Sequence, residues 1–132
     1  MLDPTLLKIS ELLHTQDNRC TGHPIFCVEQ KIRDYGYGPR WEDNPVWVSP
    51  DGDECDEGEP EAVETAYRDR WETVTMMFTQ ESADAFIQQN EHRYHRGLRV
   101  YVDSLYRNPE MIYIRNWLLK YGEEAEHGST DD

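Results

Sequence analysis

A stretch of acidic residues without any lysine or arginine divides the sequence and limits where a hydrophobic core can form. Ten of the 27 acidic residues lie between Trp41 and Tyr67, and all 13 basic residues lie elsewhere. The last ten residues, 123–132, hold five more acids and again no base. Because charged side chains are almost never buried without partners, the core has to form from the parts of the chain outside these two segments, where acids and bases nearly balance.

The chain has 132 residues, which is enough for one domain with a core of its own. Aromatic residues make up 11%, a share that disordered chains rarely reach. No apolar run is long enough to cross a bilayer, and the N-terminus lacks a signal-peptide pattern. The three cysteines, Cys20, Cys27 and Cys55, do not resemble a secreted disulfide framework. We therefore expect a cytoplasmic protein.

Three segments carry helix-start signals followed by an apolar stripe. Asp3-Pro4 and Asn108-Pro109 each place a capping side chain directly before a proline, and Thr79 can cap a third helix. Apolar residues recur every three or four residues after each start. The first helix is expected to fade near Thr15, and the last to stop at Gly122.

Apolar residues recur at every second position in four further segments, which predicts strands within residues 26–32, 46–48, 71–79 and 98–102. The sequence thus predicts an α+β fold, with an antiparallel or mixed sheet of about four strands and three helices packed on one face. It predicts a single domain over residues 1–122, with an acidic insertion or loop at 41–67 and a flexible acidic tail at 123–132. We expect these residues to be buried together: Val28, Val74, Phe78, Val100, Ile114 and Leu118.

Two groups of residues could in principle bind a metal ion. The first is Cys20, His23 and Cys27, and the second is His92 with His95. Zinc sites usually draw four ligands from two closely spaced pairs, whereas the spacing of the first group is irregular. The two histidines lack the i, i+4 spacing of a helical zinc motif. The sequence therefore predicts no metal and no other cofactor, although either group could be tested directly.

A basic and aromatic segment is a candidate nucleic-acid-binding surface. Arginines can bind phosphates and aromatic rings can stack on bases. The alternative is that these arginines lie on the outer face of a strand and pair with neighbouring acids. The candidate residues are Arg93, Arg96, Arg99 and Arg107.

The clustered acids are the leading candidate for a partner-binding surface. Evenly mixed charge would serve solubility as well as segregated charge does, whereas clustered carboxylates speed encounters with a basic partner. A tryptophan beside them could supply an apolar anchor. The alternative is a solubilising loop without a partner. The predicted site comprises Asp51, Asp53, Glu54, Asp56 and Glu57, with Trp41 or Trp47 as the anchor.

The chain resembles a family of small uncharacterised phage and prophage proteins over most of residues 23–121, apart from the acidic middle. The resemblance is carried by residues 23–30, by 71–74 with 78–79, and by 99–102 with 106–110. The resemblance implies a viral origin and expression in the cytosol of a bacterial host. It lends no agreed activity and no catalytic residues. The chain itself has no nucleophile elbow, phosphate-binding glycine loop or dinucleotide fingerprint, so we expect no enzymatic activity.

These features lead to one main hypothesis and one alternative. The main hypothesis is a non-enzymatic interaction protein that binds and modulates a host or defence protein with a basic surface. Its sharper form is an acidic nucleic-acid mimic that inhibits a defence system such as CRISPR. The alternative is a small nucleic-acid-binding module that uses the segment from Arg93 to Arg107.

Overall fold

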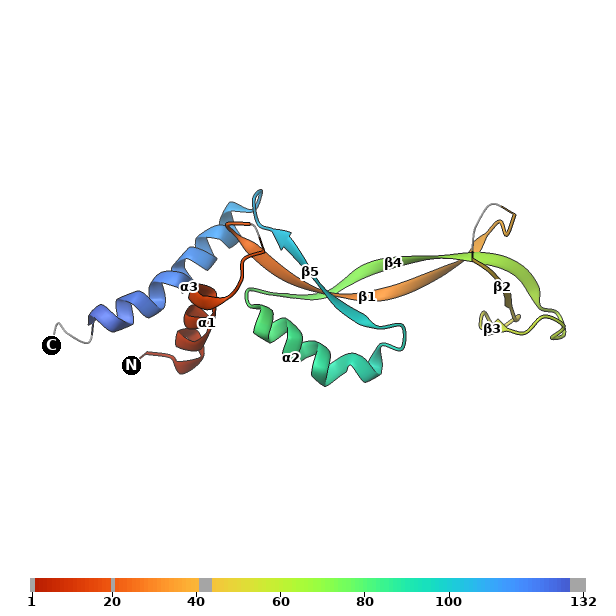
Figure 1. Ribbon diagram of the computed structural model, residues 1–132, viewed down its shortest axis with the longest axis horizontal. Helices are drawn as coiled ribbons and strands as arrows, with labels where there is room; N and C mark the ends of the chain where they lie inside the picture. The colour runs from red at the N-terminus through yellow and green to blue at the C-terminus, as the bar shows by residue number, and fades with distance from the viewer. Residues whose placement is uncertain (1, 20, 41–43, 129–132) are drawn as a thin grey trace. The chain divides into compact units, whose positions relative to one another are not determined.

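The computed structural model describes residues 2–19, 21–40 and 44–128, and it confirms the α+β class (Figure 1). Five strands form one sheet in the order β3-β2-β4-β1-β5. The β1–β5, β2–β3 and β2–β4 pairings are antiparallel. In chain order, the elements are α1 (Pro4–Thr15), β1 (Pro24–Tyr37), β2 (Pro45–Val48), β3 (Glu54–Cys55), β4 (Val63–Met77), α2 (Gln80–Asn90), a 3-10 turn (Glu91–Arg93), β5 (Leu98–Ser104) and α3 (Pro109–Gly128).

The chain divides into two compact units, and the strands β1 and β4 contribute residues to both. We call residues 1–30 with 73–132 the helical unit, because it contains α1, α2 and α3. We call residues 31–72 the hairpin unit, because its regular structure consists of strands. No helix in the described part of the chain is both long enough and apolar enough to span a membrane.

The three predicted helix starts are confirmed by their hydrogen bonds. The Asp3 carboxylate accepts from the backbone N–H of Thr5 at 2.8 Å, and the Thr79 hydroxyl accepts from that of Ser82 at 3.3 Å. The Asn108 side chain accepts from the N–H of Met111 at 3.1 Å. Each cap satisfies a backbone donor that the first turn of a helix leaves without a partner.

The helical unit buries its apolar residues on both faces of the sheet, so the expectation of three helices on one face was wrong. Phe26 and Val28 of β1 pack with Ala83 and other residues of α2. Ile25 and Cys27 pack with residues of α3. Successive strand residues point to opposite faces, so α2 and α3 cover different sides. Residues 25–28 of β1 are all apolar, so both faces of this strand have to be buried. A strand with alternating apolar and polar residues would need burial on one face only.

The expected single cluster of core residues is also wrong in part. Val28 and Val100 belong to the cluster under α2, whereas Phe78 packs in the other cluster. Leu118 is buried, but Ile114 is 38% exposed. The inward face of α3 instead carries Arg115, a residue that is 3% exposed and whose guanidinium donates to the carbonyl of Gly22 at 3.3 Å.

Gly122 does not end α3, which continues to Gly128 and so includes the first residues of the predicted tail. Its role is a close approach to α1. The Gly122 N–H donates to the Ser10 hydroxyl at 3.1 Å, and that hydroxyl donates to the Leu119 carbonyl at 3.2 Å. A Cβ at position 122 would lie 2.6 Å from the Ser10 oxygen. The glycine is therefore explained by helix packing. Residues 129–132 lie outside the described residues.

The hairpin unit is held largely by polar and aromatic contacts between β1 and its neighbours. The Arg33 guanidinium donates to both carboxylate oxygens of Asp69, at 2.9 and 3.1 Å, and to Glu54 at 2.9 Å. The same guanidinium lies 3.6 Å from the ring centre of Tyr67. The Asp69 and Glu54 carboxylates raise the pKa of Arg33 above its ordinary value, although desolvation opposes them. Arg33 thus connects β1 to both β3 and β4.

Candidate functional site

All five acids predicted to bind a partner are exposed on the hairpin unit, and four of them lie in the connections on either side of β3. Asp51 and Asp53 belong to the connection between β2 and β3, where the Gly52 N–H donates to the Ser49 carbonyl at 2.9 Å and Gly52 adopts a φ of 88°. Pro50, Asp51 and Gly52 therefore form a tight turn, in which glycine accepts the positive φ without strain. The other two are Asp56 and Glu57, in the connection that follows β3.

Glu54, the fifth predicted acid, has an internal structural role. Its carboxylate accepts from Arg33 at 2.9 Å and from the Tyr35 hydroxyl at 3.0 Å. A carboxylate held by two side chains of its own fold is a poor candidate for a partner contact. Glu54 is exposed like its neighbours, but it differs from them in having these internal hydrogen-bond partners.

Trp47, one of the two tryptophans predicted as an anchor, lies on one face of β2. Trp47 pairs with Cys55 on one side and Glu64 on the other. Its neighbour Val48 pairs with Glu54 and Val63 and points to the opposite face. Trp47 is half-buried, and Trp41 lies outside the described residues.

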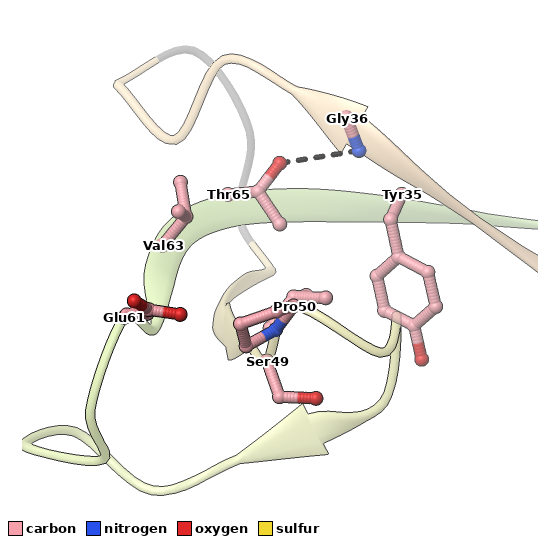
Figure 2. A pocket seen from close by; sticks show the side chains of 8 residues that line it. Tyr35, Gly36, Ser49, Pro50, Glu61, Val63 and Thr65 are labelled. Atoms are coloured by element: carbon pink, nitrogen blue, oxygen red, sulfur yellow. Dashed lines mark hydrogen bonds between the residues drawn. The ribbon is translucent and has the colours of Figure 1, made fainter.

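A pocket of about 380 Å³ opens on the face that carries Val48 (Figure 2). The side chains of Tyr35, Pro50 and Val63 give it an apolar wall, and Val63 is 64% exposed. The Thr65 hydroxyl at its edge accepts from the Gly36 N–H and donates to the Tyr37 carbonyl, both at 3.1 Å. The full lining is Tyr35, Gly36, Val48, Ser49, Pro50, Glu61, Val63 and Thr65.

Glu61 supplies the pocket with a carboxylate on an unusual backbone. Its φ is 63°, in the left-handed region that residues other than glycine rarely adopt. In the view of Figure 2, the Pro50 ring lies between the Glu61 carboxylate and the Tyr35 ring. Within the described part of the chain, the exposed Glu61 carboxylate has no hydrogen-bond or ion-pair partner. It is therefore available to a ligand in the pocket.

The sequence prediction missed Glu59, Glu61 and Glu64, which are exposed on the same unit. The sequence did contain a signal for these three acids, because the segment without lysine or arginine continues to residue 67. The predicted site stopped at Glu57. The charges also affect Cys55, whose thiol pKa is raised by desolvation and then by Glu59 and Asp56. The whole segment thus favours positive over negative charge nearby.

The arginines of the alternative site are divided between paired and exposed side chains. Arg99 forms an ion pair with Glu29 at 2.8 Å and lies 5.5 Å from the ring centre of Tyr101. Arg93 and Arg107 are exposed, and Arg96 is half-buried. Arg99 is thus engaged by its own fold.

The candidate metal ligands do not form a site in the described part of the chain, where no three His, Cys, Asp or Glu side chains group to hold an ion. Cys27 is 5% exposed and packs against Ile25 and Leu105. Desolvation, followed by the charges of Asp103 and Glu29, raises its thiol pKa. His92 and His95 are exposed, His23 is half-buried, and Cys20 lies outside the described residues.

Comparison with family models, curated proteins and solved structures finds no match for this chain.

Proposed function

We propose that the protein is a non-enzymatic interaction module that binds a basic protein surface through its hairpin unit. The observation that carries the proposal is a group of exposed acids beside an apolar pocket in one unit. No ion pair or hydrogen bond from the side chains of this group is present within the described part of the chain. The group, which we call the acidic rim, consists of Asp51, Asp53, Asp56, Glu57, Glu59, Glu61 and Glu64.

Electrostatics supports a basic partner. Like charges gathered on one surface repel each other, and a complementary positive surface relieves that repulsion on binding. Long-range attraction raises the association rate at low salt and is screened once the Debye length shortens. The pocket adds what a charge cluster lacks, namely a concave apolar surface that fixes one orientation.

The narrower form of the proposal is nucleic-acid mimicry by a phage-encoded protein. Carboxylates spaced along strands and turns would occupy a host or defence protein's phosphate-binding surface, and so inhibit it. This form rests on the acidic rim together with the resemblance to phage proteins.

The test compares two variants with equal net charge. The rim variant carries Asp51→Asn, Asp53→Asn, Asp56→Asn and Glu57→Gln, and leaves Glu54 in place because Arg33 depends on it. The control variant neutralises four exposed acids of the helical unit: Glu11→Gln, Glu81→Gln, Asp84→Asn and Glu91→Gln. Proteins that the wild-type chain captures from nuclease-treated bacterial lysate are identified and purified. Their association rates with the wild type, the rim variant and the control variant are then measured at several salt concentrations.

We expect the rim variant alone to lose most of the association rate and its salt dependence, at an unchanged melting temperature. Equal losses in both variants would mean that only net charge matters, and unchanged rates in both would reduce the acidic rim to a solubilising surface. A complex that forms with nucleic acid and disappears on charge reversal at Arg93 and Arg107 would favour the alternative function.

A further inference from the structure

We infer that the pocket of the hairpin unit is a receptor for a single arginine side chain of the basic partner. The inference rests on the proposed function and specifies its recognition chemistry. It follows from three properties of the same cavity: its apolar wall, its one carboxylate without an internal partner, and the negative charge around it.

The apolar wall selects a side chain with an aliphatic part. Val48, Pro50 and Val63 present hydrocarbon surface, and a purely polar ligand would leave that surface in contact with water. Arginine and lysine both carry an aliphatic stem that packs on apolar surface while the charged end stays at a polar boundary. An uncharged apolar side chain would also fit the wall, so the wall alone does not distinguish a cationic ligand from an apolar one.

The Glu61 carboxylate favours a cationic side chain over an apolar one. It lies at the edge of an apolar pocket, where an ionised group attracts a cation more strongly than it does in open water. Its left-handed φ of 63° is a backbone strain of the kind that tends to persist at functional positions. An aliphatic side chain in the pocket would leave this carboxylate without a partner and partly desolvated.

Arginine fits better than lysine because its guanidinium is planar. A planar guanidinium can bind a carboxylate with two parallel hydrogen bonds, and it can stack on an aromatic ring, whereas an ammonium does neither. The pocket lining includes Glu61 for the hydrogen bonds and Tyr35 for stacking, and the Pro50 ring lies between the two in the view of Figure 2, so each is a separate contact that the guanidinium can make. The hairpin unit makes such contacts internally, with Arg33 over Tyr67 at 3.6 Å and Arg68 over Tyr37 at 4.2 Å.

The experiment titrates the full chain with short capped peptides that differ at one position. All of them carry the same two flanking lysines, and the central residue is arginine, lysine, citrulline or leucine. Citrulline keeps the shape of arginine and removes its charge. Binding is followed by the amide resonances of Gly36, Ser49 and Val63 in two-dimensional NMR spectra, which report the pocket directly.

We expect the arginine peptide to bind best, with lysine about threefold weaker and citrulline at least about tenfold weaker. Glu61→Gln should weaken the arginine peptide by about five- to tenfold, whereas the matched change Glu59→Gln, an acid outside the pocket lining, should weaken it less than about twofold. Val63→Ser, at an exposed wall position, should weaken all four peptides.

The outcomes separate this inference from the proposed function. Tighter binding of the leucine peptide would overturn the arginine assignment, as would equal effects of Glu61→Gln and Glu59→Gln. In either case, the acidic rim could still bind basic proteins through its overall charge. If instead no peptide binds and the rim variant behaves like wild type toward every captured protein, the proposed function itself fails.

Discussion

The helical unit and the hairpin unit are stabilised by different kinds of interaction. Of the described apolar side chains that are buried, eight lie in the helical unit, and the hairpin unit contributes Ala66. The hairpin unit instead relies on ion pairs and cation–π contacts, with Arg33 bound to Asp69 and Glu54 and stacked on Tyr67. One unit is therefore a small hydrophobic core, and the other is a strand assembly with little core.

This difference indicates how stability and binding are divided in the molecule. Apolar burial depends weakly on salt, whereas ion pairs near the surface weaken as salt rises. A segment with few buried apolar contacts also opens locally at lower free energy than a core does. We therefore expect the binding surface to lie on the more easily opened of the two units.

The largest expected effect is the loss of the helical unit's core. Phe26 is completely buried under α2, so Phe26→Ala should lower the free energy of unfolding by about 3–5 kcal/mol through lost transfer energy and a residual cavity. Thermal or urea denaturation measures it. Met76→Ala, at an exposed position of β4, is the control and should cost far less. A small effect of Phe26→Ala would mean that the described core does not dominate stability.

The next effect concerns the hairpin unit alone. Arg33→Ala leaves Asp69 without its bidentate partner and removes contacts of Glu54 and Tyr67. We expect local opening of residues 31–72 to become easier by about 1–3 kcal/mol, because the side chain is mostly buried and charge-assisted bonds are strong. Amide hydrogen exchange measures this opening. Arg70→Ala, which breaks the more exposed pairs with Asp34 and Glu72, should ease the opening much less, because solvent screens exposed ion pairs.

A smaller effect should follow from salt without any mutation. Raising the ionic strength should change amide exchange in the hairpin unit more than in the helical unit, because screening acts on its ion pairs and on the repulsion within the acidic rim, and leaves apolar burial almost unchanged. A neutral osmolyte at matched osmolality serves as the control. An equal change in both units would contradict the division described above.

The smallest effect concerns the reactivity of one thiol. The pKa of Cys55 is raised by desolvation and by the charges of Glu59 and Asp56, so its reactive thiolate should become abundant only above its ordinary titration range. Neutralising both acids, with Asp56→Asn and Glu59→Gln, should lower that pKa and speed alkylation near pH 8 by about two- to threefold. Mass spectrometry of the Cys55 peptide measures the rate, with Asp84→Asn as a control. No change in rate would show that these charges do not reach the thiol.

The sequence predicted those features that are set by neighbouring residues. Asp3, Thr79 and Asn108 cap helices through groups two or three residues away, so short patterns reveal them. Features that depend on distant residues were missed or wrong. Gly122 fits a helix-stop pattern, but it is explained by Ser10 on another helix, and the outward rotation of Ile114 follows from Arg115 facing inward.

The same reasoning explains what was predicted of the candidate site. The base-free run located the acidic segment, because charge is a property of composition. It could not separate Glu54 from its neighbours, since that depends on Arg33 and Tyr35 from another strand. Nor could it find the pocket, whose walls come from β1, β2 and β4 together with the adjoining turns. The positive φ of Glu61 has no counterpart in local sequence, where glycine or asparagine would be the usual signal.

The contact between Ser10 and Gly122 has a consequence for how this sequence can change over generations. An added methyl group at position 122 would lie too close to the Ser10 hydroxyl oxygen, at 2.6 Å, whereas its 3.2 Å distance to the Ser10 Cβ asks only for a small shift. Alanine at position 122 therefore becomes easier to accept once residue 10 has lost its hydroxyl. The order of the two substitutions matters, because the reverse order passes through the more crowded intermediate. Among descendants of this chain, the two positions should drift as a pair, although 112 residues separate them.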